Sequence, residues 1–334
     1  MGVDFKVFKG SKSGDIVEST GHREAGPTEV LVKVTHCGVC GTDGLYRHAD
    51  KGLGHESVGI ITEVGSSVHS LSDFKVTTPS HDYSTVAPRV LTKSSYLGRQ
   101  TLCDNYQCFG NSNSDQGGFG TAVAWDVSAL FKIPDEIASE HAGPLLCGGA
   151  TVWHPLFASG LKPGDRVGII GVGGLGHLAI QFAAKLGLEA VVFTSTESKT
   201  QDAMKFGATE VHVTSGVTKF EAVAKLDALL LTANALPQLS IYLPILAAGA
   251  QVFPLTVSTE TLPLSPLDLI RGRLHVIGSN SAGVDSTRAM LDFAAKNGIR
   301  PQIQKFPLSS SGVTTALQTL RDGNMRYRGV LVVE

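Results

Sequence analysis

The chain has 334 residues, 42% hydrophobic and 17% charged, a length and composition typical of a globular protein with two domain cores. Its formal net charge of −2 gives no reason to expect nucleic acid or an anionic membrane as a partner. No apolar run is long enough to span a bilayer, and the N-terminus lacks the apolar core of a signal peptide, so we expect a cytoplasmic protein.

The first part of the chain, to about residue 145, is expected to be rich in β-structure. Residues 30–34 alternate as a half-buried strand does, and residues 58–64 predict a second strand. Residues 77–118 are rich in Ser, Thr, Asn, Asp and Gly and lack periodicity. This segment predicts a long irregular lobe, which in a compact protein indicates a function or a lost stabilising device.

From residue 161 onward the pattern changes to strands that alternate with helical stretches, which predicts a doubly wound parallel sheet. The expected strands are residues 166–170, 190–194, 210–213, 228–231, 251–254 and 275–278. Two helices near 286–296 and 311–321 and a strand at 329–333 follow without continuing the alternation. We therefore expect this tail to return to the first domain.

A glycine-rich turn lies between the first of these strands and the following helix. Gly171, Gly173 and Gly176 have the spacing Gly-x-Gly-x-x-Gly, after a short apolar run and before residues with helical periodicity. In a dinucleotide site the first glycine permits the turn, the second lets the backbone approach the pyrophosphate, and the third lets the helix pack on the strand. The motif predicts nucleotide binding, whereas the alternative is a turn that only packs a helix on a sheet.

The cysteines and one histidine suggest a metal site. The five cysteines are an odd number in a chain expected to be cytoplasmic, which favours thiols or metal ligands over disulfides. Cys40, His55 and Cys147 would form a set of two thiolates and one imidazole, which suits a catalytic zinc with an open fourth position. Taken alone, the pair Cys37-x-x-Cys40 fits equally half a zinc knuckle or a redox pair.

Four motifs in order resemble the zinc-dependent medium-chain alcohol dehydrogenases, in particular the cinnamyl-alcohol-dehydrogenase-like branch with its fungal members. They are Cys-Gly-Val-Cys-Gly-Thr-Asp, Gly-His-Glu, Pro-Leu-Leu-Cys-Gly-Gly-Ala-Thr-Val and Gly-Val-Gly-Gly-Leu-Gly-His. The resemblance covers nearly the whole chain and implies an α/β protein with a GroES-like β-barrel catalytic domain and a Rossmann domain. The implied boundaries are residues 1–146 with 282–334 for the catalytic domain and 147–281 for the Rossmann domain.

The resemblance also implies roles for single residues. Cys40, His55 and Cys147 match the ligands of one catalytic zinc, and Cys37 matches no ligand position. Among the neighbouring residues, Thr42 matches the hydroxyl that bonds the reacting oxygen, Asp43 a carboxylate that orients a ligand, and Glu56 the carboxylate beside the metal. The shortened segment after Tyr46 indicates a wide pocket, for which we consider Tyr46, Trp125 and Trp153 as lining residues, with core packing as the alternative for the two tryptophans.

Two features depart from the family pattern. Leu45 stands where many relatives have a histidine that relays the substrate proton, and leucine cannot transfer a proton. The second departure concerns the structural zinc, whose ligand spacing in relatives is Cys-x-x-Cys-x-x-Cys-x7-Cys. Cys103 fits the last position, but the other positions are Ser95, Thr92 and Arg89, and Cys108 adds too few thiols for a closed site. We therefore expect one zinc per chain and no structural zinc.

The end of the second Rossmann strand indicates which nucleotide binds. NAD-binding members of this fold have an acidic residue that grips the ribose, and Thr194 occupies that position here. Without that carboxylate, a 2′-phosphate is not repelled, so we predict NADP(H), with Glu197 as the one discordant charge and a solvated polar turn as the alternative. The residues expected to contact the nucleotide are Gly171, Gly173, Gly174, Leu175, Gly176, Thr151, Thr194, Ser195, Thr196, Lys199 and, near the phosphates, Arg328.

These features together predict an NADP(H)-dependent oxidoreductase that transfers a hydride from NADPH to an aldehyde or ketone, reversibly, with a bulky or aromatic substrate. Leu45 and the altered lobe motivate an alternative, the reduction of an iminium or a conjugated alkene. A nucleotide-binding protein without turnover is a third possibility. The family implies a small-molecule carbonyl or alcohol substrate and a homodimer formed through the edges of the Rossmann sheets, for which residues 263–278 are the segment to examine.

Overall fold

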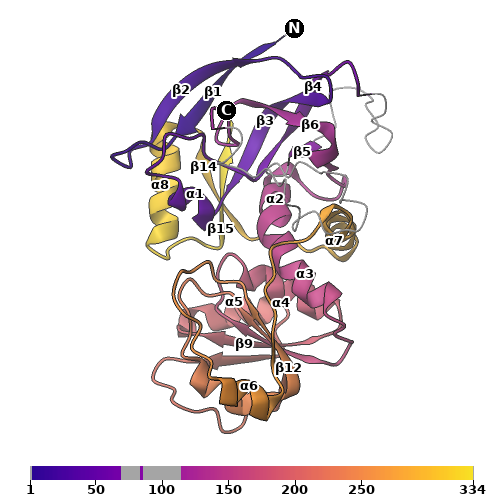
Figure 1. Cartoon of the computed structure of the whole chain (residues 1–334), viewed down its shortest axis with the longest axis vertical. Coiled ribbons are helices and arrows are strands. Elements are labelled where there is room, and N and C mark those ends of the chain that lie inside the picture. Colours follow the sequence, from indigo (N-terminus) through magenta and orange to yellow (C-terminus); the bar gives the residue numbers. More distant parts are fainter. Residues whose placement is uncertain (1, 69–82, 86–113, 334) are drawn as a thin grey trace. The chain divides into compact units, whose positions relative to one another are not determined.

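The chain divides into two structural units (Figure 1). A computed structural model describes residues 2–68, 83–85 and 114–333. One unit joins Met1–Cys147 to Gly283–Glu334, and the other is Gly148–Ala282. The tail of the chain therefore belongs to the first unit. Both boundaries fall one residue beyond the ones expected from the sequence.

The first unit is built on β3 (Glu29–Val39), a long strand in the middle of a seven-stranded sheet. Its residues Val30, Val32 and Val34 are fully buried and Lys33 is exposed, although Leu31, on the same face as Lys33, is buried too. The sheet order is β14 (Ile303–Pro307), β15 (Arg328–Val332), β3, β4 (Ser57–Val64), β5 (Tyr83–Thr85) and β7 (Leu130–Lys132), with β6 (Ala122–Asp126) paired to β3. A separate two-stranded ribbon consists of β1 (Val3–Lys9) and β2 (Val17–Arg23).

Short helices close the first unit. Near the strand ends lie α1 (Gly41–Leu45), the 3₁₀ turn η3 (Val127–Ala129) and α2 (Ser139–Pro144). The tail adds α7 (Val284–Asn297) and α8 (Ser310–Arg321), the second of which begins where the Ser309 hydroxyl accepts a hydrogen bond from the Gly312 amide. Val313, Ala316 and Leu317 give α8 a buried face that packs with residues of β3 and β15 in one apolar cluster.

The second unit contains the expected parallel sheet, which confirms the predicted fold class. Its strand order is β10 (Glu210–Val213), β9 (Glu189–Thr194), β8 (Arg166–Ile170), β11 (Leu226–Leu231), β12 (Leu246–Pro254) and β13 (His275–Val276). The central strands are nearly continuous apolar runs because both faces of the sheet are covered. The unit's helices are α3 (Ala150–Ala158), α4 (Gly176–Lys185), α5 (Thr200–Lys205) and α6 (Pro266–Gly272), and a π-helical turn, η4 (Leu145–Gly149), leads into α3.

The crossovers around β11 differ from the sequence expectation. Helical stretches are expected between all the strands, but residues 214–225 form turns and bends, and only the 3₁₀ turns η6 (Leu239–Ile241) and η7 (Leu243–Ile245) precede β12. Pro237 and Pro244 break any longer helix there, because proline lacks the amide that the helix ladder needs. A further 3₁₀ turn, η5 (Glu197–Lys199), leads into α5.

The lobe predicted for residues 77–118 lies mostly outside the described residues. This holds for Cys103 and Cys108 and for the three positions, Arg89, Thr92 and Ser95, where the family pattern would place cysteines. The expectation that the structural zinc is absent therefore stays a prediction. Among the residues that the structure does describe, no helix is both long enough and apolar enough to cross a membrane.

Candidate metal centre and nucleotide site

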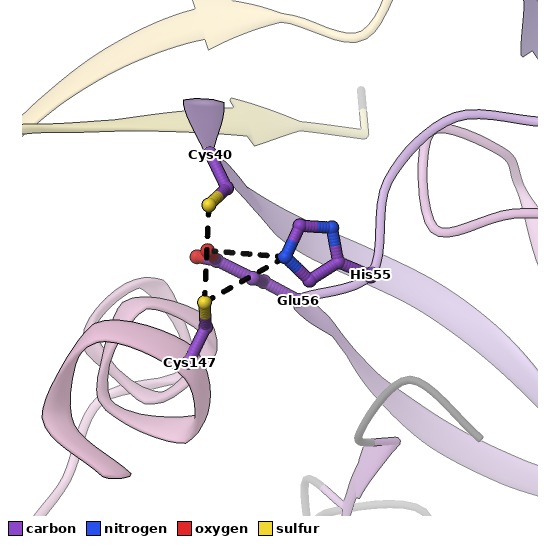
Figure 2. Close-up of side chains that lie close together, drawn as sticks. All are labelled: Cys40, His55, Glu56 and Cys147. Atoms are coloured by element: carbon purple, nitrogen blue, oxygen red, sulfur yellow. Dashed lines mark hydrogen bonds and ion pairs between the residues drawn. The ribbon is translucent and has the colours of Figure 1, made fainter. Parts of the chain in front are cut away.

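Four side chains from three segments of the first unit meet in one cluster, in which Glu56 is buried and the other three residues are half-buried (Figure 2). Cys40 follows the end of β3 and precedes α1, while His55 and Glu56 lie directly before β4. The pairing of β3 with β4, in which Cys37 faces Ser57, places the end of one strand beside the start of the other. Cys147 reaches the same point from the turn η4.

The spacing of these side chains fits a metal ion. The two Sγ atoms of Cys40 and Cys147 lie 3.9 Å apart, and Cys147 Sγ lies 3.6 Å from His55 Nε2. In a tetrahedral zinc site with Zn–S bonds of ~2.3 Å, two sulfurs lie roughly 3.8 Å apart. With a carboxylate oxygen of Glu56, the ligand atoms all lie within 4.8 Å of one another. The set of two thiols and one imidazole therefore fits zinc with a position left for another ligand.

Asp43 is hydrogen-bonded to three groups at this cluster. Its buried carboxylate accepts hydrogen bonds from the backbone amides of Cys40, at 2.9 Å, and Gly54, at 3.1 Å. One of its oxygens also lies 2.9 Å from His55 Nδ1, so this nitrogen donates and Nε2 is left to face the sulfurs. Burial lowers the pKa of His55, but the Asp43 carboxylate and Cys40 shift it upward overall. These contacts agree with the orienting role predicted for Asp43, which stays a prediction.

The pKa values of the two cysteine thiols in the cluster are shifted in opposite directions. The hydrogen bond from Cys147 lowers the pKa of Cys40 despite burial, while the same contact and burial raise the pKa of Cys147. Two thiolates coexist at this separation when a divalent cation lies between them. Cys37 points elsewhere: its thiol is buried with its pKa raised by burial, and it lies outside the cluster, as expected for a residue that is not a ligand.

Glu56 and Arg328 form a buried ion pair beside the cluster. Arg328 Nη2 donates to Glu56 Oε1, and both side chains are almost completely buried. Burial raises the pKa of Glu56, and the Arg328 guanidinium opposes this shift. The second oxygen, Glu56 Oε2, has no hydrogen-bond partner among the described residues. The predicted contact of Arg328 with cofactor phosphates stays a prediction, since its partner in the structure is Glu56.

The glycine turn of the second unit has the expected strand–turn–helix context. Gly171 follows β8 with a φ of 98°, which L-residues with a side chain rarely adopt. A Cβ on Gly176 would overlap the Gly171 carbonyl oxygen, so only glycine lets α4 start this close to the strand. A Cβ on Gly173 would meet no atom within 4 Å, which leaves its backbone open to a ligand. Gly174 lies in the same turn, and Leu175 is the N-cap of α4.

A cavity of about 620 Å³ extends from this turn along the carboxyl ends of the strands. Thr194 is buried there, and its hydroxyl lies 3.3 Å from the backbone nitrogen of Thr196. Ser195 and Lys199 line the cavity, whereas Thr196 and Glu197 do not. The sequence reasoning missed residues from the next two crossovers, which line it too: Thr214, Gly216, Val217, Thr232, Ala233, Asn234, Ala235, Pro237, Gln238, Ile241 and Tyr242. Their positions after β10 and β11 were the available signal, because ligands bind outside the carboxyl ends of parallel strands.

The other candidate residues have more ordinary surroundings. Trp153 is 1% exposed and stacks on Phe157 while its edge meets Phe182, so it packs in the core of the second unit. Trp125 is likewise buried among the valines of β3. Tyr46 packs at the edge of the apolar cluster that includes α8, and Lys51 lies over its ring. Core packing therefore accounts for both tryptophans, and Thr151 lies half-buried on α3.

Family models match both units. Residues 26–135 match the alcohol dehydrogenase GroES-like domain, and residues 174–296 match the zinc-binding dehydrogenase domain. Together with the cluster around Cys40 and the glycine turn, these matches define the class as a zinc-type alcohol dehydrogenase, an oxidoreductase acting on small molecules.

Individual relatives narrow the class. A probable cinnamyl alcohol dehydrogenase from Pinus taeda is 32% identical over 95% of this chain and 94% of its own length. The 8-hydroxygeraniol dehydrogenase of Catharanthus roseus is also 32% identical, over 93% of this chain and 89% of its own. The chain belongs to the cinnamyl-alcohol-dehydrogenase-like branch of the zinc-dependent medium-chain alcohol dehydrogenases, which confirms the resemblance inferred from the motifs.

Solved structures agree with this assignment. A cinnamyl alcohol dehydrogenase from Sorghum bicolor superposes with a TM-score of 0.88 at 26% identity, covering 99% of this chain and 98% of its own. A cinnamyl alcohol dehydrogenase of Helicobacter pylori, solved in complex with NADP(H), superposes with a TM-score of 0.85 at 26% identity, covering 99% of both chains. These neighbours confirm the expected pair of domains, GroES-like and Rossmann.

Proposed function

We propose that this protein is an NADP(H)-dependent zinc enzyme that reduces an aldehyde or ketone and, in reverse, oxidises the alcohol. The observation that carries the proposal is the half-buried set of Cys40, His55 and Cys147, with the buried Asp43 fixing the imidazole. One catalytic zinc per chain would be held by these three ligands. When bound, zinc supplies a Lewis acid that polarises a carbonyl or lowers the pKa of an alcohol.

The chain's own residues have defined tasks in this scheme. Asp43 holds His55 in the tautomer that leaves Nε2 for the metal, and it fixes the backbone at Cys40 and Gly54. Thr42 lies one residue into α1, with its hydroxyl 3.7 Å from Cys40 Sγ, and would hydrogen-bond the reacting oxygen. Asp43 is completely buried, so little water screens its contacts with the half-buried residues of the cluster.

NADP(H) is supported by the cavity beside β9. Thr194 supplies no carboxylate there, Ser195 supplies a hydroxyl, and Lys199 supplies positive charge to a 2′-phosphate. The Helicobacter relative was solved with the same nucleotide. We assign the turn Gly171–Gly173–Gly174–Leu175–Gly176 to the pyrophosphate. The assignments of Thr151, Thr196 and Arg328 to the cofactor belong to this proposal too.

A homodimer through the edge of the parallel sheet is also part of the proposal. β13 pairs with β12 on one side only, so its other edge lacks a strand partner among the described residues. Exposed apolar residues gather in the sequence around this edge: Val257, Leu267, Ile270, Val276 and Ile277. An unpaired edge with exposed apolar side chains favours association with a second copy.

The decisive experiment measures NADPH oxidation with a panel of aromatic and aliphatic aldehydes, cyclic iminium ions and enones. We expect turnover with aldehydes and a loss of about 10³-fold in kcat/KM for Cys147→Ala, since Lewis-acid polarisation supplies several kcal/mol. Removal of zinc by a chelator should have the same effect. Undiminished aldehyde reduction by either preparation would contradict the zinc mechanism.

The same panel tests the alternative chemistries. Turnover confined to iminium ions or enones would contradict carbonyl reduction and would support the alternative motivated by Leu45, the reduction of an iminium or a conjugated alkene. Leu45 is 67% exposed and offers no proton donor, so in carbonyl reduction the alkoxide would receive its proton by way of water or Thr42. Tight binding of NADPH without turnover of any substrate would favour a nucleotide-binding protein.

A further inference from the structure

Gly38 lies two residues before the ligand Cys40 on β3, and the space where its side chain would stand is filled by Glu56. A Cβ on Gly38 would overlap Glu56 Oε2 and would lie 2.9 Å from Glu56 Cδ and 3.1 Å from Glu56 Cβ. The Glu56 side chain is completely buried, so this recess holds it on the side of β3. Any residue other than glycine at position 38 would have to displace the carboxylate.

The backbone of Glu56 has no freedom to yield instead. Its carbonyl accepts a hydrogen bond of 3.1 Å from the Gly38 amide. On the other side, a Cβ on Gly143 of α2 would overlap the same carbonyl oxygen, so the helix packs directly on it. Ser57, the next residue, is already paired with Cys37 in the sheet. A methyl group at position 38 must therefore turn the carboxylate rather than shift the strand.

The direction of that turn follows from the neighbours. Oε1 is paired with Arg328, and Oε2 has no partner among the described residues. The oxygen paired with Arg328, Glu56 Oε1, already lies 3.9 Å from His55 Nε2, and Figure 2 shows the carboxylate end directed towards the ligand atoms. An oxygen expelled from the recess at Gly38 would meet the metal-binding atoms.

We propose that Gly38 is a positioning residue that keeps the Glu56 carboxylate paired with Arg328 and outside the metal's ligand set, so that the fourth position stays open for substrate. This inference rests on the proposed function, because it assumes a metal at the cluster. The charges at the site give a reason to keep the Glu56 carboxylate away from the metal. Two thiolates already neutralise a divalent cation, and a third anionic ligand would weaken its pull on a substrate oxygen.

The test compares Gly38→Ala with Gly41→Ala, a matched control just after Cys40 where a Cβ would meet no atom within 4 Å. Both variants and the wild type are loaded with Co²⁺, and their visible spectra are recorded without nucleotide, with and without added imidazole. Changes in groups that orient a metal site typically alter metal affinity by about 10- to 100-fold. We expect Gly38→Ala to bind Co²⁺ more tightly than the wild type by that factor, measured in competition with a chelator. Its spectrum should differ from that of the wild type and should no longer shift when imidazole is added. Wild type and Gly41→Ala should both respond to imidazole.

A compensating variant separates positioning from simple damage. Glu56→Asp shortens the side chain by one methylene, so the double variant Gly38→Ala/Glu56→Asp should recover the imidazole response. If Gly38→Ala does not fold, recovery of folding and of the Co²⁺ spectrum in the double variant supports the proposal. It is overturned if Gly38→Ala matches the wild type, if Gly41→Ala changes equally, or if the double variant fails to recover. Absence of thiolate–Co²⁺ absorption in the wild type would instead refute the metal centre of the proposed function.

Discussion

The candidate metal site and the glycine turn are the two regions to which we assign function, and they are built in opposite ways. The turn is one continuous segment, from β8 through Gly171 to α4, and its geometry is set by local backbone sterics. The cluster draws Cys40, His55 and Cys147 from separate segments, and Arg328 supports it from the tail. A continuous site fails when a single glycine changes, whereas a dispersed site depends on the strands that bring its parts together.

The strongest way to test this contrast is Gly176→Ala. The added methyl would overlap the Gly171 carbonyl and force α4 away from β8, so we expect NADPH affinity to fall by at least ~100-fold, as the pyrophosphate loses its cradle. Zinc content should stay at one per chain, because no ligand belongs to the second unit. Calorimetric titration with NADPH and elemental analysis measure both. Gly216, which lies outside the glycine turn, is unsuitable as a control position, because its φ of 75° would strain any residue with a side chain.

Gly173→Ala sharpens the same prediction, because no protein atom lies within 4 Å of an added Cβ there. NADPH should bind more weakly while the unfolding temperature stays that of the wild type. A large fall in unfolding temperature would show that Gly173 is needed for packing rather than for the pyrophosphate.

Asp43→Asn tests the dispersed site with a change of similar shape. The amide can no longer hold both the His55 imidazole and the two backbone amides as an anion does, so zinc affinity should fall by about 10- to 100-fold. NADPH affinity should be unchanged. Competition for zinc with a chelating dye provides the measurement, and zinc affinity equal to the wild type would remove Asp43 from the orienting role.

Lys199→Ala distinguishes the two nucleotides at the cavity beside β9. A hydrogen bond to a charged group is worth about 1.5–3 kcal/mol, so affinity for NADPH should fall by roughly 10- to 100-fold. Affinity for NADH should hardly change, because NADH has no 2′-phosphate for Lys199 to contact. Fluorescence titration with both nucleotides decides the matter, and equal losses for the two would show that Lys199 acts elsewhere.

The smallest expected effect concerns an ion-pair network at the start of three strands of the same sheet. Arg166 at the start of β8 bridges Glu189 of β9, at 2.6 Å, and Glu210 of β10, at 2.7 Å. Although burial opposes it, hydrogen bonds from Arg166 and His212 lower the pKa of Glu210. Its contribution to stability is thus present above the ordinary carboxyl pKa of about 4.5 and is lost as the pH falls through the lowered folded value.

Glu210→Gln should therefore destabilise the protein by about 1 kcal/mol or less at pH 7, because the pair is partly exposed. The difference from the wild type should shrink towards pH 4. Thermal unfolding across this range, with and without salt, provides the measurement. A difference that grows on acidification would contradict the assignment.

The same contrast explains how far sequence reasoning reached. The glycine turn, β8 and α4 are set by spacing and apolar periodicity within about twenty residues, so they were predictable from the residues alone. Residue types suggested the grouping of Cys40, His55 and Cys147, but its assignment needed the family resemblance, because no local pattern shows that β3 and β4 bring them together. The partnership of Glu56 with Arg328 depends on β15 pairing with β3, and no local signal predicted it. The choice between pocket and core for Trp153 could not be made from the sequence, because aromatic residues near a site and in a core have the same local sequence.

One consequence of the strand order concerns how the protein is made. β15, residues 328–332, lies between β14 and β3, so the last strand of the sequence enters the interior of the sheet beside Gly38. A nascent chain that has emerged only as far as Cys147 already contains every thiol and imidazole of the cluster, but its Glu56 has no counter-ion and β3 has an open edge. Zinc captured at that stage would meet a free carboxylate as a ready fourth ligand. In the proposed zinc enzyme, the ion pair that engages the Glu56 carboxylate would therefore form only once β15 has joined β3.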